Sequence, residues 1–525
     1  MKKTEKFLLS GVMLAATTLF MRLVSVVFNV YVTNKIGSAG MGLITLINSV
    51  YGFAVTFATS GINLSATRMC AEALGRGSDK ELKGAMSKCI IYALSFGVSA
   101  MLLLFFLAEP IGFYWLKDER TVLCLKCLSI ALPFIALSSA FNGYFTAVRR
   151  VYKNASAVII EQGIKIFITI NALSVLLPRG IEYSCIAVIG GGAVAEMTSF
   201  AYYLILFIRD KKKHIGDKGD KGSGLGKRLL GIALPVAMTA YVRSGLLTVE
   251  HALIPIGLKK NGATATGALS IYGTIHAMVF PIVLFPQAVL AAFNGLVIPE
   301  FSESLARNDR GHINRVANKV IKTTAVFASL ASVLVFSYAD ELGNGIYNSA
   351  GAASYIRIFS LLIPVMYIDS AVDSILKGMG EQVYSMKVNI LDAAVSTVLV
   401  YLILPFWGIM GYVFIIFFCE LMNTVLSGMK LKRIVSLKIN WLKGLFLPLF
   451  SACGGVMITK LLTYIIPVMG NESGLATVVK MTLSLAMAVV FLFTTGSISP
   501  EEITSLISFR RKKPSMDNGL KRSMR

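Results

Sequence analysis

The sequence has few charged residues for its length. Of its 525 residues, 15% are charged and 55% are hydrophobic. Soluble domains carry about 25% charged residues. The chain therefore lacks the polar surface needed to cover a globular core of this size. This composition excludes an ordinary soluble protein and predicts an all-α polytopic membrane protein.

Acidic residues are the scarcer of the two charged classes. The chain has 28 Asp and Glu against 51 Lys and Arg, a formal net charge of +23. Such a surplus could suggest binding to nucleic acid, but no soluble segment is evident that could hold that interface. We therefore predict no nucleic-acid partner and attribute the surplus to membrane topology.

Motifs for disulfides, metals and nucleotide chemistry are also missing. The seven cysteines are odd in number and scattered, which argues against a disulfide scaffold. Cys124 and Cys127 form a CxxC without a second pair or a nearby His, so we predict no metal site. The segment GSGLGKR fails the GxxxxGK[ST] nucleotide-binding pattern. The sequence thus predicts neither an enzyme nor a cofactor.

Long apolar runs are what the sequence does contain. Spanning the hydrocarbon takes about 20 apolar residues. Such runs recur about fourteen times, from one centred near Arg22 to one near Ala486. The first run is too long for a signal peptide and lacks a clear cleavage site, so we interpret it as a retained helix. The prediction is about 14 transmembrane helices.

The basic residues are distributed unevenly between the two sides of the predicted membrane. With the N-terminus placed in the cytoplasm, the inner segments hold 38 Lys and Arg and the outer loops hold 8. This is a strong positive-inside signal. It predicts a cytoplasmic membrane location, both termini in the cytoplasm and an even number of helices. Basic loops also predict anionic membrane lipids as partners.

The two halves of the chain resemble each other. Arg22 falls opposite Arg243, and SVYG at Ser49 falls opposite SIYG at Ser270, both at an offset of 221. Further on, Glu161 matches Asp392 and Glu196 matches Glu420. Six helices per copy give parallel repeats around a central cavity. We expect five parts: an N-terminal lobe (1–208), a basic cytoplasmic linker (209–227), a C-terminal lobe (228–432), helices 13 and 14 (433–496) and a basic cytoplasmic tail (497–525).

The eighth predicted helix contains two prolines. Pro281 and Pro286 each remove a backbone donor and favour a kink. Irregular backbone at membrane depth needs protein or water around it. We therefore expect this helix to be bent or broken and to line the cavity.

Arg22 and Arg243 are the most conspicuous candidate site residues. A charge at mid-bilayer costs about 2.5–3.5 kcal/mol even on lenient scales. Two repeat-related guanidinium groups facing one cavity would suit a diphosphate, which accepts paired hydrogen bonds. The alternative is that each arginine pairs with a carboxylate of its own lobe and holds helices together. Neither has an acidic residue one turn away on its own helix.

Several carboxylates are predicted at membrane depth. Glu161 and Lys165 are spaced i, i+4 and are expected to form a structural pair. Glu250 replaces Asn29 of the first repeat, and with His251 and His276 it is the best proton or cation site. Asn29 is a candidate for polar substrate contact. The candidates for a coupling ion, either proton or sodium, are Glu250, His276, Asp369, Asp373, Glu196 and Glu420.

Two stretches resemble a known family. FNVYVTNKIGSAGMGLITLINSVYGF and SGINLSATRMCAEALGRGSDKE, with the arginine of the first helix, are similar to the multidrug/oligosaccharidyl-lipid/polysaccharide exporter superfamily. The likeness is to its polysaccharide flippase branch, which includes sporulation proteins and lipid II flippases. It implies alternating access between two lobes, a basic cavity for a polyprenyl-diphosphate-linked glycan, and a lipid-tail groove near the last two helices. By position, Arg22 and Arg68 match basic cavity residues of that branch.

Three functions fit these observations to different degrees. The first is a flippase for a lipid-linked oligosaccharide or peptidoglycan precursor, favoured by fourteen helices and a basic cavity. The second is a cation-coupled drug exporter of the same superfamily, which twelve helices would favour. A membrane glycosyltransferase would need a large outer loop or carboxylates near an interface, and the predicted outer loops are short.

Overall fold

The computed structural model describes residues 3–214, 216, 219, 222, 224–437, 442–465 and 474–497. Every regular element in these ranges is a helix, mostly α-helix with short π-helical and 3-10 turns. The predicted all-α fold is therefore confirmed.

Two of the helices are much longer than a membrane is thick. α1 (Lys3–Thr59) has 57 residues and α15 (Gln382–Ile434) has 53. At 1.5 Å per residue, either one would be roughly 80 Å long if straight, against a hydrocarbon core of about 30 Å. Each is kinked at a glycine with positive φ, Gly37 (φ 74°) and Gly408 (φ 53°). Glycine tolerates this backbone conformation because it has no Cβ, so each long helix forms two segments.

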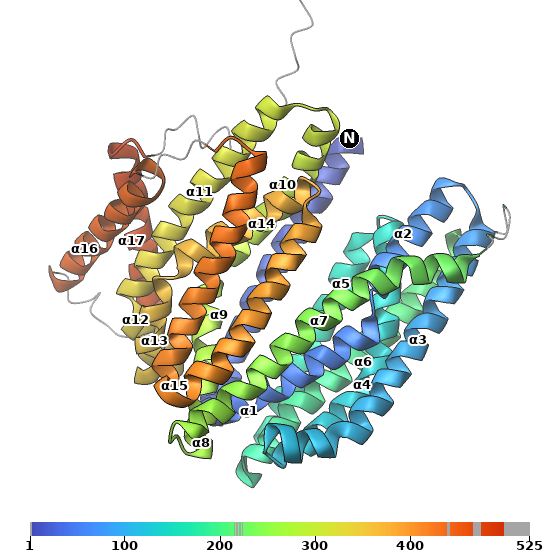
Figure 1. Ribbon diagram of the computed structural model, residues 1–525, viewed down its shortest axis with the longest axis horizontal. Helices are drawn as coiled ribbons and strands as arrows, with labels where there is room; N and C mark the ends of the chain where they lie inside the picture. The colour runs from blue at the N-terminus through green and yellow to red at the C-terminus, as the bar shows by residue number, and fades with distance from the viewer. Residues whose placement is uncertain are drawn as a thin grey trace, which may run out of the picture.

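A first bundle follows the kink in α1 (Figure 1). Its helices α3 and α6 both pack on α4, and α5 packs on α6. Its elements are α2 (Ile62–Gly75), α3 (Asp79–Pro110), the π-helical turn η1 (Ile111–Leu116), α4 (Arg120–Ala147), α5 (Val151–Leu176), the 3-10 turn η2 (Leu177–Arg179) and α6 (Ile181–His214). We call α2 to α6 the first bundle.

A second bundle begins after α7 (Leu225–Lys260). Its elements are α8 (Ala265–Gly273), the π-helical turn η3 (Thr274–Val279), α9 (Phe280–Leu284), α10 (Gln287–Ala306), α11 (Arg310–Ser337), α12 (Ala339–Tyr347), α13 (Ala350–Ser360), α14 (Ile363–Gly378) and α15. We call α8 to α15 the second bundle. Outside it, η4 (Leu442–Phe446), α16 (Leu447–Ile465) and α17 (Gly474–Thr494) pack against α11 and α12 (Figure 1).

The predicted break in the eighth helix is present. The segment runs through the π-helical turn η3, and its helical pattern is interrupted at Phe285 and Pro286 between α9 and α10. Proline cannot donate a backbone hydrogen bond, which explains why the break falls there.

The described residues contain 11 helices that are long and apolar enough to cross a membrane, or up to 12 if the bent pair α13 and α14 is one span. The chain is a multi-pass membrane protein. This number counts each of the two kinked helices once. The predicted count of fourteen stays a prediction.

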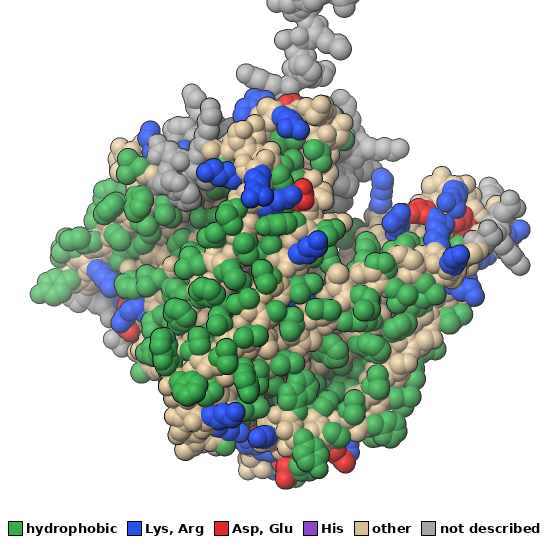
Figure 2. All heavy atoms as spheres, viewed as in Figure 1, with side chains coloured by type: hydrophobic (Ala, Val, Ile, Leu, Met, Phe, Trp, Pro, Cys, Tyr) green, Lys and Arg blue, Asp and Glu red, His purple; other side chains and the backbone are tan. Residues whose placement is uncertain are grey.

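The two bundles meet at one end of the molecule and separate at the other (Figure 1). They approach near α8, at the end that also holds Gly37, Gly262 and Gly408, which we call the kink end. They diverge at the end where α6 stops and α7 starts, which we call the linker end. In Figure 2, Lys and Arg gather mainly along the upper edge, which is the linker end, and apolar side chains cover the middle. This edge is notched between the bundles.

Candidate functional site

α1 and α7 contact both bundles. α1 packs on α3 to α6 of the first bundle and on α8, η3 and α10 of the second. α7 packs on α2 and α3 of the first bundle and on α8 and α15 of the second. These two helices therefore form much of the boundary between the bundles. They are also the helices that carry Arg22 and Arg243.

The kink end of this boundary is closed by small residues. A Cβ at Gly42 of α1 would overlap the backbone carbonyl of Leu269 in α8, and one at Gly273 would overlap the carbonyl of Ser38. The Ser38 and Ser270 hydroxyls share a 2.6 Å hydrogen bond across the same contact. The two backbones touch here, so this contact leaves no room for any larger side chain.

At the linker end, the start of α7 is attached to the first bundle by charge. Arg228 forms ion pairs with Glu72 of α2 and, at 3.2 Å, with Glu81 of α3. Glu81 is buried and also accepts from Arg76 at 2.8 Å. A Cβ at Gly61 would lie 2.8 Å from the carbonyl oxygen of Ala233, so α7 also approaches the first bundle closely. This half of α7 thus belongs to the first bundle.

The other half of α7 is attached to the second bundle. The Ser396 hydroxyl of α15 donates to Glu250 Oε1 at 2.6 Å, and the Thr397 hydroxyl donates to the Leu246 carbonyl at 3.3 Å. Further along, a Cβ at Gly257 would crowd the side chain of Leu404. α7 therefore passes from one bundle to the other along its length.

Arg22 is exposed on the first segment of α1. It forms neither a hydrogen bond nor an ion pair with any residue that the structure describes. It lies close enough to Tyr367 of α14 to interact with it electrostatically. Tyr367 itself donates to the Val283 carbonyl at 2.7 Å. The arginine is thus at the boundary with the second bundle, with its donors available to a ligand.

Arg243 and Arg68 have acidic neighbours. Arg243 is exposed and makes no ion pair with a described residue, but it interacts electrostatically with Asp392 of α15. Arg68 is exposed, and its Nε donates to Glu72 at 3.0 Å within α2. Neither of the two repeat-related arginines has a carboxylate within ion-pair distance in the described residues, but Arg243 interacts electrostatically with Asp392.

Asn29 contributes to the closed boundary. Its side-chain amide donates to the backbone carbonyl of Ala277 in η3 at 2.6 Å. One turn of π-helix leaves this carbonyl accessible to the side chain, since π-helices change the regular hydrogen-bond pattern. One amide hydrogen of Asn29 is therefore already used between α1 and the second bundle.

Glu250 lies in a buried polar cluster. Next to it in sequence, His251 Nδ1 shares a 2.8 Å hydrogen bond with the Tyr272 hydroxyl. His276 Nε2 shares one of 2.8 Å with the Tyr412 hydroxyl, and the two histidine rings are 4.8 Å apart between centroids. Sequence reasoning selected Glu250 and both histidines but missed the two tyrosines. The SIYG repeat was the only signal for Tyr272, and Tyr412 had none.

The remaining carboxylates of the second bundle are divided. Asp369 of α14 interacts electrostatically with Asp392, and both interact with Glu420 of α15. Asp369 and Asp392 each have one buried carboxyl oxygen without a hydrogen-bond partner in the described residues. Asp373 instead binds Lys377 at 2.5 Å and accepts from Ser385. Asp369 and Asp373 share a helix face, as their spacing predicts, but they have different partners.

The first bundle has a smaller acidic group at matching repeat positions. Glu196 of α6 interacts electrostatically with Glu161 and Lys165 of α5. Glu161 and Lys165 also interact with each other, without approaching within ion-pair distance. The Lys165 ammonium thus lies near two carboxylates, and the second bundle has no lysine at the corresponding position, 396, which is serine.

In the part of the chain that the structure describes, no group of three or more His, Cys, Asp or Glu side chains is placed to hold a metal ion.

Comparisons with known proteins identify relatives of this chain by sequence. Residues 8–221 match the family described as polysaccharide biosynthesis protein. The chain is 23% identical over 443 residues to stage V sporulation protein B of Bacillus subtilis (strain 168), covering 83% of this chain and 85% of that protein. It is 21% identical over 360 residues to sporulation protein YkvU of the same organism, covering 67% and 78%.

Solved structures with the same fold include a lipid II flippase and a MATE family transporter. The lipid II flippase MurJ, in an inward closed conformation, has a TM-score of 0.68 at 14% identity, covering 94% of this chain and 100% of that one. An inward-facing multidrug resistance MATE family transporter of the MOP superfamily has a TM-score of 0.63 at 12% identity, covering 80% and 98%.

Two helical bundles joined by two shared helices form the fold, which this chain shares with the lipid II flippase and the MATE family transporter. More particularly, residues 8–221 match the polysaccharide biosynthesis protein family, and the chain is similar over most of its length to stage V sporulation protein B.

Proposed function

We propose that this protein is a flippase that moves a polyprenyl-diphosphate-linked oligosaccharide or peptidoglycan precursor across the membrane by alternating access. The observation that carries the proposal is the position of the two arginines. Each of the two helices that contact both bundles carries one exposed arginine, Arg22 on α1 and Arg243 on α7, at matching positions of the repeat. Both would change their surroundings whenever the bundles move relative to each other.

The chemistry of the arginines fits a diphosphate. A guanidinium group presents a planar fork of donors that can bind phosphate oxygens in pairs. Arg22 has no such partner among the described residues, so its charge is available. Charge left near mid-bilayer without a partner is costly, which supports a role in binding. Arg243 beside Asp392 would bind an anion less strongly and release it more readily.

The alternative, a cation-coupled drug exporter, accounts for less of the chain. The likeness to the MATE transporter covers 80% of this chain, whereas the likeness to the lipid II flippase covers 94%. The last two described helices, α16 and α17, lie beyond the part of the chain that repeats. We propose that residues 433–496 hold the polyprenyl tail, with 1–208 and 228–432 as the two moving lobes, 209–227 as the linker and 497–525 as a tail.

We further propose that the linker end faces the cytoplasm and that the protein resides in the cytoplasmic membrane. The support is the 38 to 8 distribution of Lys and Arg between the two sides. The divergence of the bundles at the linker end would then make this an inward-open arrangement (Figure 1). Substrate made in the cytoplasm would enter from that side.

Coupling to a proton or sodium ion would use the acidic groups of the second bundle. Asp369, Asp392 and Glu420 interact with one another, and two of them have an unpartnered buried carboxyl oxygen. Like charges placed this close favour a bound proton or cation. We therefore retain Glu250, His276, Asp369 and Glu420 as coupling candidates. Asp373, which binds Lys377, and Glu196, in the first bundle, are the weaker ones.

The test is transport of a fluorescent undecaprenyl-diphosphate disaccharide in proteoliposomes containing the full chain. We expect Arg22→Ala to abolish transport and binding while the protein remains monodisperse with an unchanged melting temperature. Arg22→Lys should recover only part of the activity, because lysine keeps the charge but loses the planar fork. Arg179→Ala, an exposed arginine at the kink end, is the matched control and should transport normally.

Three results would overturn the proposal. Wild-type affinity for the disaccharide lipid in a folded Arg22→Ala protein would show that Arg22 does not bind the diphosphate. Loss of thermal stability in Arg22→Ala, with function regained on neutralising a carboxylate of the second bundle, would show a structural ion pair instead. Transport of cationic drugs but not of the lipid by the wild type would favour the exporter.

A further inference from the structure

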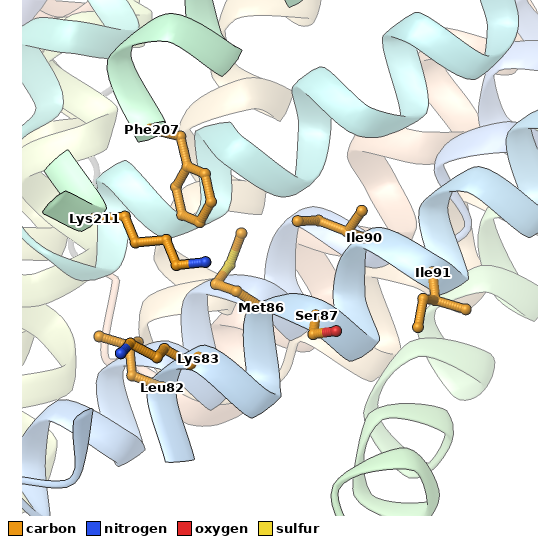
Figure 3. A pocket seen from close by; sticks show the side chains of 8 residues that line it. All are labelled: Leu82, Lys83, Met86, Ser87, Ile90, Ile91, Phe207 and Lys211. Carbon is orange, nitrogen blue, oxygen red and sulfur yellow. The ribbon is translucent and has the colours of Figure 1, made fainter. Parts of the chain in front are cut away.

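A pocket opens between α3 and α6 at the linker end of the first bundle (Figure 3). Its volume is about 200 Å³. Both helices pack on α4. Phe141 and Tyr144 of α4 form a buried cluster with three side chains that line the pocket, which are Leu82, Met86 and Phe207. The lining side chains are Leu82, Lys83, Met86, Ser87, Ile90, Ile91, Phe207 and Lys211.

The charged side chains in the lining of the pocket are basic. Its two charged members are lysines, Lys83 and Lys211, and no carboxylate of the residues that the structure describes lines it. In Figure 3 the Lys211 ammonium points across the pocket toward Met86, below the ring of Phe207. Lys211 is exposed and makes no ion pair with a described residue. The pocket is therefore a place where a negative charge would gain a partner.

The apolar and charged residues are ordered along the axes of α3 and α6. On α3 the chain runs from Lys83 at the linker end to Ile90 and Ile91 deeper in the bundle, about 12 Å further at 1.5 Å per residue. α6 runs the opposite way, so Phe207 lies deeper than Lys211. Both helices thus place a lysine toward the linker end and apolar side chains toward the middle of the bundle.

We propose that this pocket binds one anionic phospholipid, with its phosphate between Lys83 and Lys211 and the start of an acyl chain along Ile90 and Ile91. Charge at one end and apolar surface at the other match a phospholipid and not a free phosphate, which would leave the apolar part empty. Ile91 and Ser87 are exposed at the rim, which gives a lipid access from the bilayer. The site lies on the first bundle, away from the boundary that carries Arg22, and is independent of the transported substrate.

The experiment is native mass spectrometry of the full chain titrated with palmitoyl-oleoyl phosphatidylglycerol. Phosphatidylcholine with the same chains and inorganic phosphate are separate arms. We expect one phosphatidylglycerol to bind at least tenfold more tightly than phosphatidylcholine, and inorganic phosphate not to compete. Lys83→Ala with Lys211→Ala should weaken this binding roughly 25-fold, since each basic residue near a membrane surface contributes about fivefold.

The matched control is Lys88→Ala with Lys212→Ala, which removes two charges from the same helices outside the pocket lining. This control should change the affinity less than threefold. Ser87→Trp keeps both lysines but fills the pocket from its exposed rim, and it should also abolish the tight binding. Size-exclusion profiles and melting temperatures in phosphatidylcholine check that each variant is folded.

Three results would overturn the proposal. Equal weakening by the two lysine pairs would show general attraction of an anionic lipid to a basic surface. Undiminished binding to Ser87→Trp would place the lipid elsewhere. Competition by inorganic phosphate at the affinity of the lipid would show an anion site without a role for the acyl chain.

Discussion

The two ends of the boundary between the bundles are built from different contacts. At the kink end, Gly42 and Gly273 bring two backbones into contact, and a hydroxyl pair from Ser38 and Ser270 lies beside them. At the linker end, Arg228 attaches α7 to the first bundle through two carboxylates. Backbone contact requires one fitted arrangement, whereas an ion pair tolerates small shifts and weakens with salt. The kink end is therefore suited to a defined closed state, and the linker end to adjustable contact.

The largest effect is expected from fixing the kink end in its closed state. In a Ser38→Cys, Ser270→Cys protein, the two sulfur atoms should lie close enough to form a disulfide, since the hydroxyls they replace are 2.6 Å apart. Oxidation should stop transport completely, because the bundles could no longer separate there. Reduction should restore it. The single variants are the controls, and oxidised protein that still transports would mean that this end never opens.

A smaller effect is expected from a single methyl group at the same contact. Gly42→Ala should lower transport about tenfold, because overpacking of this kind costs roughly 1–3 kcal/mol and the obstacle here is backbone. Ser38→Cys in this background should become more reactive to a membrane-impermeant maleimide. Gly52→Ala, on the same helix with nothing within 4 Å, should behave as wild type. Equal activity of the two alanine variants would contradict the close fit.

The smallest effect is expected at the linker end. Arg228→Ala removes the ion pairs with Glu72 and Glu81, but Arg76 still pairs with the buried Glu81, so we expect a loss of about 1 kcal/mol, or roughly fivefold in a population ratio. Spin labels at Lys88 and Arg307 should show a shifted distance distribution, with transport reduced only severalfold. High salt should produce the same shift in the wild type and little further change in the variant. A salt-insensitive wild type would exclude a role for these charges.

The class of fold can be predicted from the sequence because the apolar runs that mark membrane helices recur along the whole chain. Apolar run length fixes where helices can cross a membrane, and Pro281 and Pro286 mark a break that the structure contains. The number of spans is harder to predict, because a helix can continue through a kink. The 57-residue α1 continues through Gly37 as one element. A glycine with positive φ bends a helix without any change in hydropathy, so composition does not reveal it.

The site was only partly predictable. A charged residue in an apolar run is visible in a sequence, so Arg22, Arg243, Glu250 and His276 could be selected. Their partners come from other helices and could not be selected. Asp392 lies near Arg243 because α7 packs on α15, and Tyr412 meets His276 across some 136 positions of sequence. The SIYG stretch is visible in the sequence as a repeat, but only the structure shows that its last glycine, Gly273, touches α1.

The division of α7 between the two bundles bears on how such a protein could be assembled from separate pieces. Its first half is held on the first bundle by Arg228 and by the approach of Gly61 to Ala233, and none of these contacts depends on an unbroken chain. We expect two polypeptides, 1–214 and 225–525, made together in one cell, to recognise each other and form a working complex. An ancestor with a single six-helix unit could have formed a dimer with its own copy, in which the first helix of one unit packed partly on the other unit. Duplication and fusion of its gene would then have fixed a dimer that already existed.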